Sequence, residues 1–192
     1  MYAFQAKGMD GRTVPHASIG EMAACYVDLV VETQPEGPYY LAGHSLGGSV
    51  AFEMAKRLEA SGREVGFVAL LDAGMPSGVD ASDAALTAQA LRVLGHAYGR
   101  EIVIEEEVLS GLAEEEQLHL IKPHLVELGL LREDAGLFLV RGLLNIFKSQ
   151  FRMAYQPDSG RVEQVMFIQA RERFDAAEQQ VLDNALSQWK LL

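Results

Sequence analysis

The residues of this chain that are best suited to carry out chemistry are Gly43-His44-Ser45-Leu46-Gly47. A serine hydroxyl is a weak nucleophile, and a tight turn between a strand and a helix can present it clear of its own backbone. Gly43 and Gly47 would remove side chains that clash across such a turn, and His44 also belongs to this nucleophile elbow. Gly48 and Ser49 would keep the following helix close to the sheet. The sequence predicts Ser45 as the nucleophile and the N–H of Leu46, at the helix start, as an oxyanion donor. The alternative is a chance glycine-rich turn, which the expected strand before and helix after the motif disfavour.

Asp72 is the candidate for the carboxylate that would orient the base of a serine nucleophile. It directly follows Val65–Leu71, which is predicted to be the next strand after the one that delivers Ser45. Because parallel strands end at the same edge of a sheet, both residues should lie at that edge. The sequence also permits a turn-forming aspartate before Ala73-Gly74. Asp175, which also resembles a helix N-cap, is the second candidate.

A general base for the serine is harder to identify. In chains with this motif, the histidine normally comes after the last strand, yet no histidine follows Ile168. His119 and His124 are five residues apart and would not share a helix face, so they also make a poor metal pair. None of the five histidines is a convincing base: His16, His44, His96, His119 and His124.

The elements around the motif are predicted to be a strand, a helix and a second strand. Tyr39–Gly43 is a short apolar run after turn residues, which is typical of a buried strand. Ser49–Ala60 has apolar residues at helical spacing, and Val65–Leu71 indicates a strand buried on both faces. Such a unit predicts a parallel sheet with a right-handed crossover. Earlier in the chain, Ser18 and Glu21 form a capping box at the start of another helix.

The pattern becomes helical between residues 80 and 160. Apolar residues recur at helical spacing in Ala84–Tyr98, Leu112–Leu128 and Leu137–Tyr155. Pro123 should kink or break the second of these helices. Insertions placed after the carboxyl end of a strand often cover an active site, so we expect residues 80–160 to form a helical lid.

The remaining segments complete an α/β core. Tyr2–Gln5 is predicted to be a short opening strand and Val162–Ile168 a late one, with a final helix at Asp175–Trp189. We expect one domain of the α/β class, in which residues 1–79 and 161–192 form the core around the helical insertion.

Composition narrows the class of protein further. The 192 residues are 49% hydrophobic and 22% charged, which is typical of a globular domain. The formal net charge of −11 argues against binding to nucleic acid or an anionic membrane by charge alone. No apolar run approaches the roughly 20 residues that a membrane span needs, so we expect no span. The single cysteine, Cys25, excludes an internal disulfide framework, so we expect a cytoplasmic location.

The block over residues 37–55, which reads GPYYLAGHSLGGSVAFEMA, resembles thioesterase domains that terminate nonribosomal peptide and polyketide assembly lines. The resemblance extends to Met22–Tyr26, Gln34–Pro38, Leu70–Asp72, Glu115–Leu118 and Tyr155–Pro157. It implies an α/β-hydrolase-like, mostly parallel sheet with helices on both faces and a helical lid insertion. It also implies catalytic roles for Ser45 and for Asp72, which stands at the family's position for the triad acid.

The function implied by this resemblance is chain release. Ser45 would take an acyl or peptidyl group from the phosphopantetheine thioester of a carrier protein, upstream in the same polypeptide. Water or an internal nucleophile would then release the group as an acid or a macrocycle. The small-molecule substrate arrives on the carrier's phosphopantetheine, so no cofactor and no metal of the chain's own is expected.

The chain departs from the family at both ends. Family members have further strands before the segment matching Tyr2, including the loop that supplies another oxyanion N–H. They also continue beyond the segment matching Gln188-Trp189 to a Gly-x-His sequence that supplies the base. We therefore expect a truncated form with an incomplete site and slow turnover.

Two other functions stay open at this point. A generic esterase uses the same elbow and would prefer simple oxygen esters to carrier-bound thioesters. A catalytically inactive module that binds an acyl group or a carrier is consistent with the missing histidine.

Overall fold

The computed structural model describes residues 1–158, 162–169 and Trp189. Its contacts divide the chain into two compact units, which we call the helical unit and the sheet unit. The helical unit comprises Met1–His16 and Val79–Arg152. The sheet unit comprises Ala17–Gly78 and Met153–Leu192, and it contains the Gly-x-Ser-x-Gly motif.

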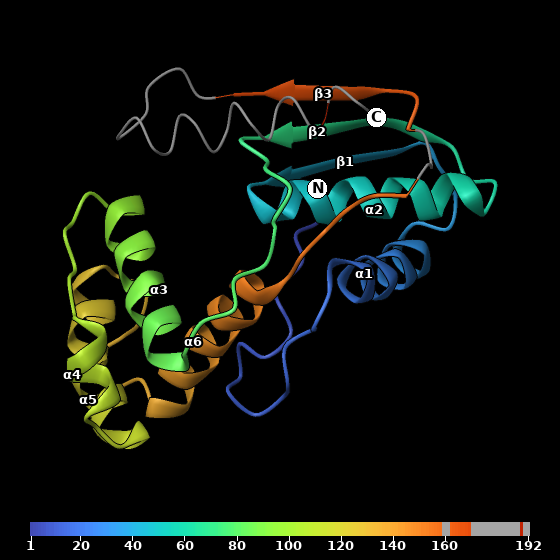
Figure 1. Ribbon diagram of the computed structural model, residues 1–192. Helices are drawn as coiled ribbons and strands as arrows, with labels where there is room; N and C mark the ends of the chain where they lie inside the picture. The colour runs from blue at the N-terminus through green and yellow to red at the C-terminus, as the bar shows by residue number, and fades with distance from the viewer. Residues whose placement is uncertain (159–161, 170–188, 190–192) are drawn as a thin grey trace. The chain divides into compact units, whose positions relative to one another are not determined.

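The sheet unit is built on three parallel strands in the order β1-β2-β3. These strands are β1 (Tyr39–His44), β2 (Val65–Leu71) and β3 (Val165–Ile168). The chain passes from β1 to β2 through α2 (Leu46–Ala60), which confirms the predicted strand–helix–strand unit (Figure 1). Helix α2 packs on β1 and β2, and α1 (Ile19–Thr33) packs on α2.

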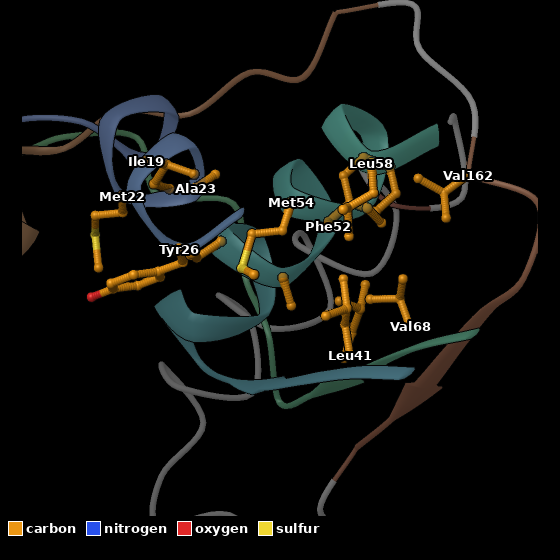
Figure 2. Packing of buried hydrophobic residues seen from close by; sticks show 14 of the residues in the cluster. Ile19, Met22, Ala23, Tyr26, Leu41, Phe52, Met54, Leu58, Val68 and Val162 are labelled. Carbon is orange, nitrogen blue, oxygen red and sulfur yellow. The ribbon is translucent and has the colours of Figure 1, made fainter. Parts of the chain in front are cut away.

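The core of the sheet unit lies between α1, α2 and one face of the sheet. Figure 2 shows Met22 and Tyr26 of α1 and Leu58 of α2 among the clustered side chains, with Leu41 and Val68 contributed by the strands. Leu58 and Val68 are both 0% exposed. Full burial of such a side chain contributes about 1.5–3 kcal/mol, so this core supplies much of the stability of the unit.

The other face of the sheet is only partly covered within the described residues. The prediction that Val65–Leu71 is buried on both faces holds at Ala69, which is 7% exposed, and fails at Phe67, which is 37% exposed. Tyr40 is 64% exposed and Met166 is 54% exposed, and Phe67 lies beside Tyr40 with ring centroids 5.3 Å apart. The reason is strand alternation. Helix α2 covers the face that carries Leu41 and Val68, and the neighbouring residues within each strand point to the opposite face.

Helix α1 begins where the capping box predicts. Ser18 is the N-cap, and its hydroxyl accepts a hydrogen bond from the backbone N–H of Glu21 at 3.1 Å. The Glu21 carboxylate reaches back and accepts from the backbone N–H of Ala17 at 2.9 Å. Both side chains therefore satisfy backbone donors at the helix start, as the sequence signature requires.

The helical unit contains the helices expected between residues 80 and 160, with one addition. They are α3 (Asp83–Ala97), the additional short α4 (Glu106–Ser110), α5 (Glu114–Glu127) and α6 (Leu137–Arg152). Leu91, Ile121 and Val140 are fully buried in a separate core between these helices. None of the helices described for the chain is long and apolar enough to cross a membrane.

Of the two outcomes predicted for Pro123, a kink or a break in the helix, the structure excludes the break. Helix α5 continues through Pro123 to Glu127. Pro123 lies on the exposed side of the helix, where solvent can satisfy the carbonyl of His119 that loses its N–H partner.

The predicted strand at Tyr2–Gln5 is also wrong, since this segment has no regular secondary structure. Residues 1–16 belong by their contacts to the helical unit, whereas the sequence placed them in the α/β core. The backbone here passes very close to α6: a Cβ on Gly142 would come within 2.7 Å of the Gly11 amide nitrogen. Contacts of this kind are non-local, which is why a strand-like sequence pattern does not reveal them.

The buried leucine of α2 provides a test of the core. Leu58→Ala should lower the free energy of unfolding by about 2–5 kcal/mol, because it leaves a cavity between the helix and the sheet. Leu29→Ala on α1, where the leucine is 45% exposed, is the matched control and should cost less than about 1 kcal/mol. Urea denaturation measures both changes, and equal losses would contradict the packing described above.

Candidate active site

Ser45 lies at the turn between β1 and α2 with φ 53° and ψ −127°. A positive φ is uncommon for a residue with a side chain, and such strain costs on the order of 1–3 kcal/mol. Hydrogen bonds hold the backbone on both sides of the turn. The Ser45 N–H donates to the carbonyl of Leu71 in β2 at 2.9 Å, and the Gly48 N–H donates to the carbonyl of Ser45 at 2.9 Å.

Glycines allow the strand and the helix to approach each other at this turn. A Cβ on Gly43 would lie 1.9 Å from the carbonyl oxygen of Gly47, and a Cβ on Gly48 would lie 2.3 Å from the Cβ of Ala73. A Cβ on Gly47 would meet nothing within 4 Å. The close approaches predicted at Gly43 and Gly48 are therefore confirmed, whereas Gly47 does not need to lack a side chain.

The side chain of Ser45 is exposed and makes no capping hydrogen bond to α2, although serine is a favoured N-cap. The hydroxyl is therefore not committed to the helix that it precedes. Leu46 is the first residue of α2, at the end of the helix where backbone N–H groups and the dipole favour negative charge. The role of its N–H as an oxyanion donor stays a prediction. His44, at the end of β1, is exposed.

Asp72 lies beside Ser45 in the order of the sheet. The parallel register pairs His44 with Leu71, so Ser45 and Asp72 are the next residues after the ends of two neighbouring strands. The Asp72 N–H continues the ladder by donating to the carbonyl of Ile168 at 2.8 Å. Asp72 has φ 45°, and within the described residues it and Ser45 are the non-glycine positions with positive φ. Both therefore occupy distorted positions at the same edge of the sheet, while their catalytic roles stay predictions.

The loop that follows Asp72 is tied to its surroundings by two side chains. The hydroxyl of Ser49 donates to the carbonyl of Gly74 at 2.9 Å, and the indole N–H of Trp189 donates to the carbonyl of Ala73 at 2.9 Å. The sequence placed Ser49 at the helix–sheet contact but gave no sign of the Trp189 bond. A tryptophan more than a hundred positions away in the chain leaves no local pattern by which to predict this bond.

The structure adds no base to this site. His44 is the histidine of the sheet unit, and the helical unit contains His16, His96, His119 and His124. No group of histidine, cysteine, aspartate and glutamate side chains in the described segments could hold a metal ion. The second acid candidate, Asp175, lies outside the described residues, as does the predicted helix at 175–189 apart from Trp189.

The two glycines of the motif make a matched pair for testing the elbow. Gly43→Ala should destabilise the protein by about 3 kcal/mol or more, because its Cβ would clash with backbone that cannot move away cheaply. Gly47→Ala should stay within about 1 kcal/mol of the wild type, since its Cβ meets open space. Thermal or urea unfolding measures both, and a tolerated Gly43→Ala would disprove the close approach.

The strain at Ser45 can be measured independently of activity. Ser45→Gly should be about 1 kcal/mol more stable than Ser45→Ala, because relief of the positive φ outweighs the extra entropy of a glycine in the unfolded chain. At Ser61, which has φ −88°, the order should reverse and the glycine variant should be the less stable one. The same order at both serines would show that the turn stores no strain.

Two solved structures share the fold of this chain. One is a crystal structure of holo-AB3403, a four-domain nonribosomal peptide synthetase, with TM-score 0.72 and 25% identity. That match covers 95% of this chain and 15% of the other. The other is the type II thioesterase BorB from the borrelidin cluster, with TM-score 0.53 and 16% identity, covering 95% of this chain and 64% of that one. At this identity BorB shows the fold alone, and the two matches confirm the predicted α/β-hydrolase-like class.

Relatives in sequence include proteins named as atromentin synthetases. Atromentin synthetase from Tapinella panuoides is 49% identical over 71 residues, which are 37% of this chain and 7% of that protein. Inactive atromentin synthetase invA4 from Paxillus involutus is 46% identical over 71 residues, 37% of this chain and 8% of that protein. The chain thus spans only a small part of the length of these relatives. The family model for the thioesterase domain matches residues 1–126, and the chain belongs to the thioesterase domain family.

Proposed function

We propose that the chain releases acyl groups from thioesters through an acyl-enzyme intermediate on Ser45. One observation carries the proposal: an exposed serine held at positive φ in a tight strand-to-helix turn, at the same sheet edge as Asp72. Strained backbone persists only where its surroundings enforce it, and such positions cluster at functional sites. Membership in the thioesterase domain family supports acyl-thioester chemistry over other uses of a serine elbow.

The proposed reaction has two steps. The hydroxyl oxygen of Ser45 attacks the thioester carbonyl, a C–O bond forms, the C–S bond breaks, and the thiol leaves with the proton that the hydroxyl gives up. Water then attacks the acyl-serine, which releases the acid and restores the hydroxyl. The N–H of Leu46 and the dipole of α2 would stabilise the oxyanion in both steps. No cofactor takes part.

Asp72 is proposed as the carboxylate that orients the base and stabilises its charged form. The proposal assigns no residue to the base itself, because the base of such sites normally follows the last strand and no histidine follows Ile168 in this sequence. Without a base, a serine site of this kind loses several powers of ten in rate. We therefore propose that the groups of this chain support only slow turnover.

We propose an acyl or peptidyl group on the phosphopantetheine arm of a carrier protein as the substrate. Similarity to a four-domain nonribosomal peptide synthetase and to atromentin synthetases supports this choice over a simple ester. Release by water would give an acid, and release by an internal nucleophile would give a ring. Mass spectrometry of the product distinguishes the two.

A second candidate function is binding of an acyl group or carrier without catalysis. Two observations favour it: the lack of an assigned base, and the resemblance to a relative whose printed name is inactive atromentin synthetase. This candidate differs sharply from the first in the behaviour of Ser45. A binding module would leave the hydroxyl unreactive.

The deciding experiment measures the reactivity of Ser45. The wild-type protein should be labelled by a serine-directed fluorophosphonate and should hydrolyse an acyl-phosphopantetheine thioester, whereas Ser45→Ala should lose the label and at least about 100-fold in rate. Asp72→Asn should keep the fold and lose less rate than Ser45→Ala does, because Asp72 acts through a base that the proposal leaves unassigned. Ser61→Ala, at the far end of the same helix, is the control and should change neither.

Three outcomes would redirect the proposal. Equal rates for wild type and Ser45→Ala would remove Ser45 from the mechanism. Absence of labelling, with retained binding of acylated carrier, would favour the binding module. A strong preference for a simple oxygen ester over the thioester would favour a generic esterase.

A further inference from the structure

The loop that follows Asp72 is fastened to the helix that begins after Ser45. We call residues 73–74 the acid loop. Its two carbonyl groups each accept a hydrogen bond from a side chain rather than from backbone of the sheet. The donors come from α2 and from the far end of the chain.

Ser49 is the first of these donors. It lies in the first turns of α2 and is 0% exposed, and its hydroxyl donates to the carbonyl of Gly74 at 2.9 Å. Ser49 is removed from water, so the loss of the Gly74 carbonyl as partner would leave its hydroxyl buried without a bond. The bond therefore links the start of α2, and with it the turn at Ser45, to the acid loop.

Trp189 is the second donor. Its indole N–H donates to the carbonyl of Ala73 at 2.9 Å, and its ring meets Phe52 of α2 edge-on with centroids 4.9 Å apart. Indole can donate only one hydrogen bond, and here the packing against Phe52 fixes the direction of that donor. The acid loop is thus bonded to Ser49 of α2 and to Trp189, whose ring packs against Phe52 of α2.

The backbones of α2 and the acid loop lie very close together. A Cβ on Gly48 would lie 2.3 Å from the Cβ of Ala73, so the helix and the acid loop touch directly. Gly48, Ser49 and Phe52 stand within one turn of each other along the helix, and all three face this contact. The carbonyl bonds therefore fix the loop in register along a surface that already fits it closely.

We propose that Ser49 and Trp189 are positioning residues that lock Asp72 in place relative to Ser45. This inference rests on the proposed function, in which the two residues act together. Asp72 is held at φ 45°, a conformation that its neighbours must maintain. Releasing the acid loop would let the carboxylate drift without removing it from the site, and displacements of about 1 Å can cost about 100-fold in rate.

The kinetic test uses two substitutions that remove the hydrogen-bond donor of each residue, and Trp189→Phe keeps an aromatic ring at its position. Ser49→Ala and Trp189→Phe should each lower kcat for thioester hydrolysis by about tenfold and leave KM within about twofold. The double variant should lose less than the product of the two single losses, since both act on one loop. Thr87→Val is the matched control: Thr87 is 2% exposed, and its hydroxyl bonds only within its own helix, so kcat should not change.

The structural test uses Trp189 as a probe, because it is the single tryptophan of the chain. Ser49→Ala should shift its emission to longer wavelength and increase its quenching by acrylamide, whereas Thr87→Val should do neither. For Trp189→Phe, amide hydrogen exchange at Gly74 and Met75 should become faster at unchanged global stability. This second readout also serves if Ser49→Ala fails to fold.

The outcomes separate this inference from the proposed function. If the wild type hydrolyses the thioester and both single variants keep its kcat, the positioning role is wrong. If the wild type is no faster than Ser45→Ala, the proposed function is wrong, and fluorescence alone then decides whether Ser49 restrains Trp189 and the acid loop. If the fluorescence of Ser49→Ala is unchanged, or changes no more than that of Thr87→Val, Ser49 does not restrain Trp189 and the acid loop.

Discussion

The close backbone contact between the end of β1 and the start of α2 is the constraint on which the rest of the sheet unit depends. It exists because Gly43 and Gly48 lack a Cβ, which would come within 1.9 Å and 2.3 Å of neighbouring atoms. Once the strand and helix meet this closely, the residue between them has no room for ordinary backbone angles, and Ser45 takes a positive φ. The exposure of its hydroxyl follows from steric exclusion rather than from any attraction between the serine and its surroundings.

The cost of this turn is small beside the burial that enforces it. Strain at Ser45 and Asp72 is on the order of 1–3 kcal/mol each, while each fully buried side chain in the core contributes about 1.5–3 kcal/mol. Leu58 and Val68 hold α2 on the sheet from positions that play no part in the proposed chemistry. The parallel register then brings Asp72 to the edge beside Ser45 without further adjustment. The packing of the core therefore sets the backbone geometry at which Ser45 and Asp72 are placed.

How much of this could be predicted from sequence depends on how local the cause is. The strand–helix–strand unit and the placement of Ser45 and Asp72 at one edge followed from apolar runs and turn residues within a few positions of each other. Three features could not be predicted in this way, because contacts with residues distant in the chain determine them. They are the partly exposed sheet face, the continuous helix through Pro123 and the irregular segment Tyr2–Gln5. The open space beside Gly47 escaped prediction for the same reason, because it depends on how the strand and the helix pack.

Helix α2 also anchors the chain where it returns from the helical unit. The phenol of Tyr155 donates to the carboxylate of Glu53 at 3.0 Å, and Lys56 pairs with both Glu53 and Asp158. Burial, reinforced by the Glu53 charge, raises the pKa of Tyr155 well above its ordinary value, so the phenol stays protonated and continues to donate. One helix therefore supports the nucleophile turn at its start and the return segment in its middle. Because the inserted helices have a core of their own, their sequence can change while α2 keeps the elbow intact.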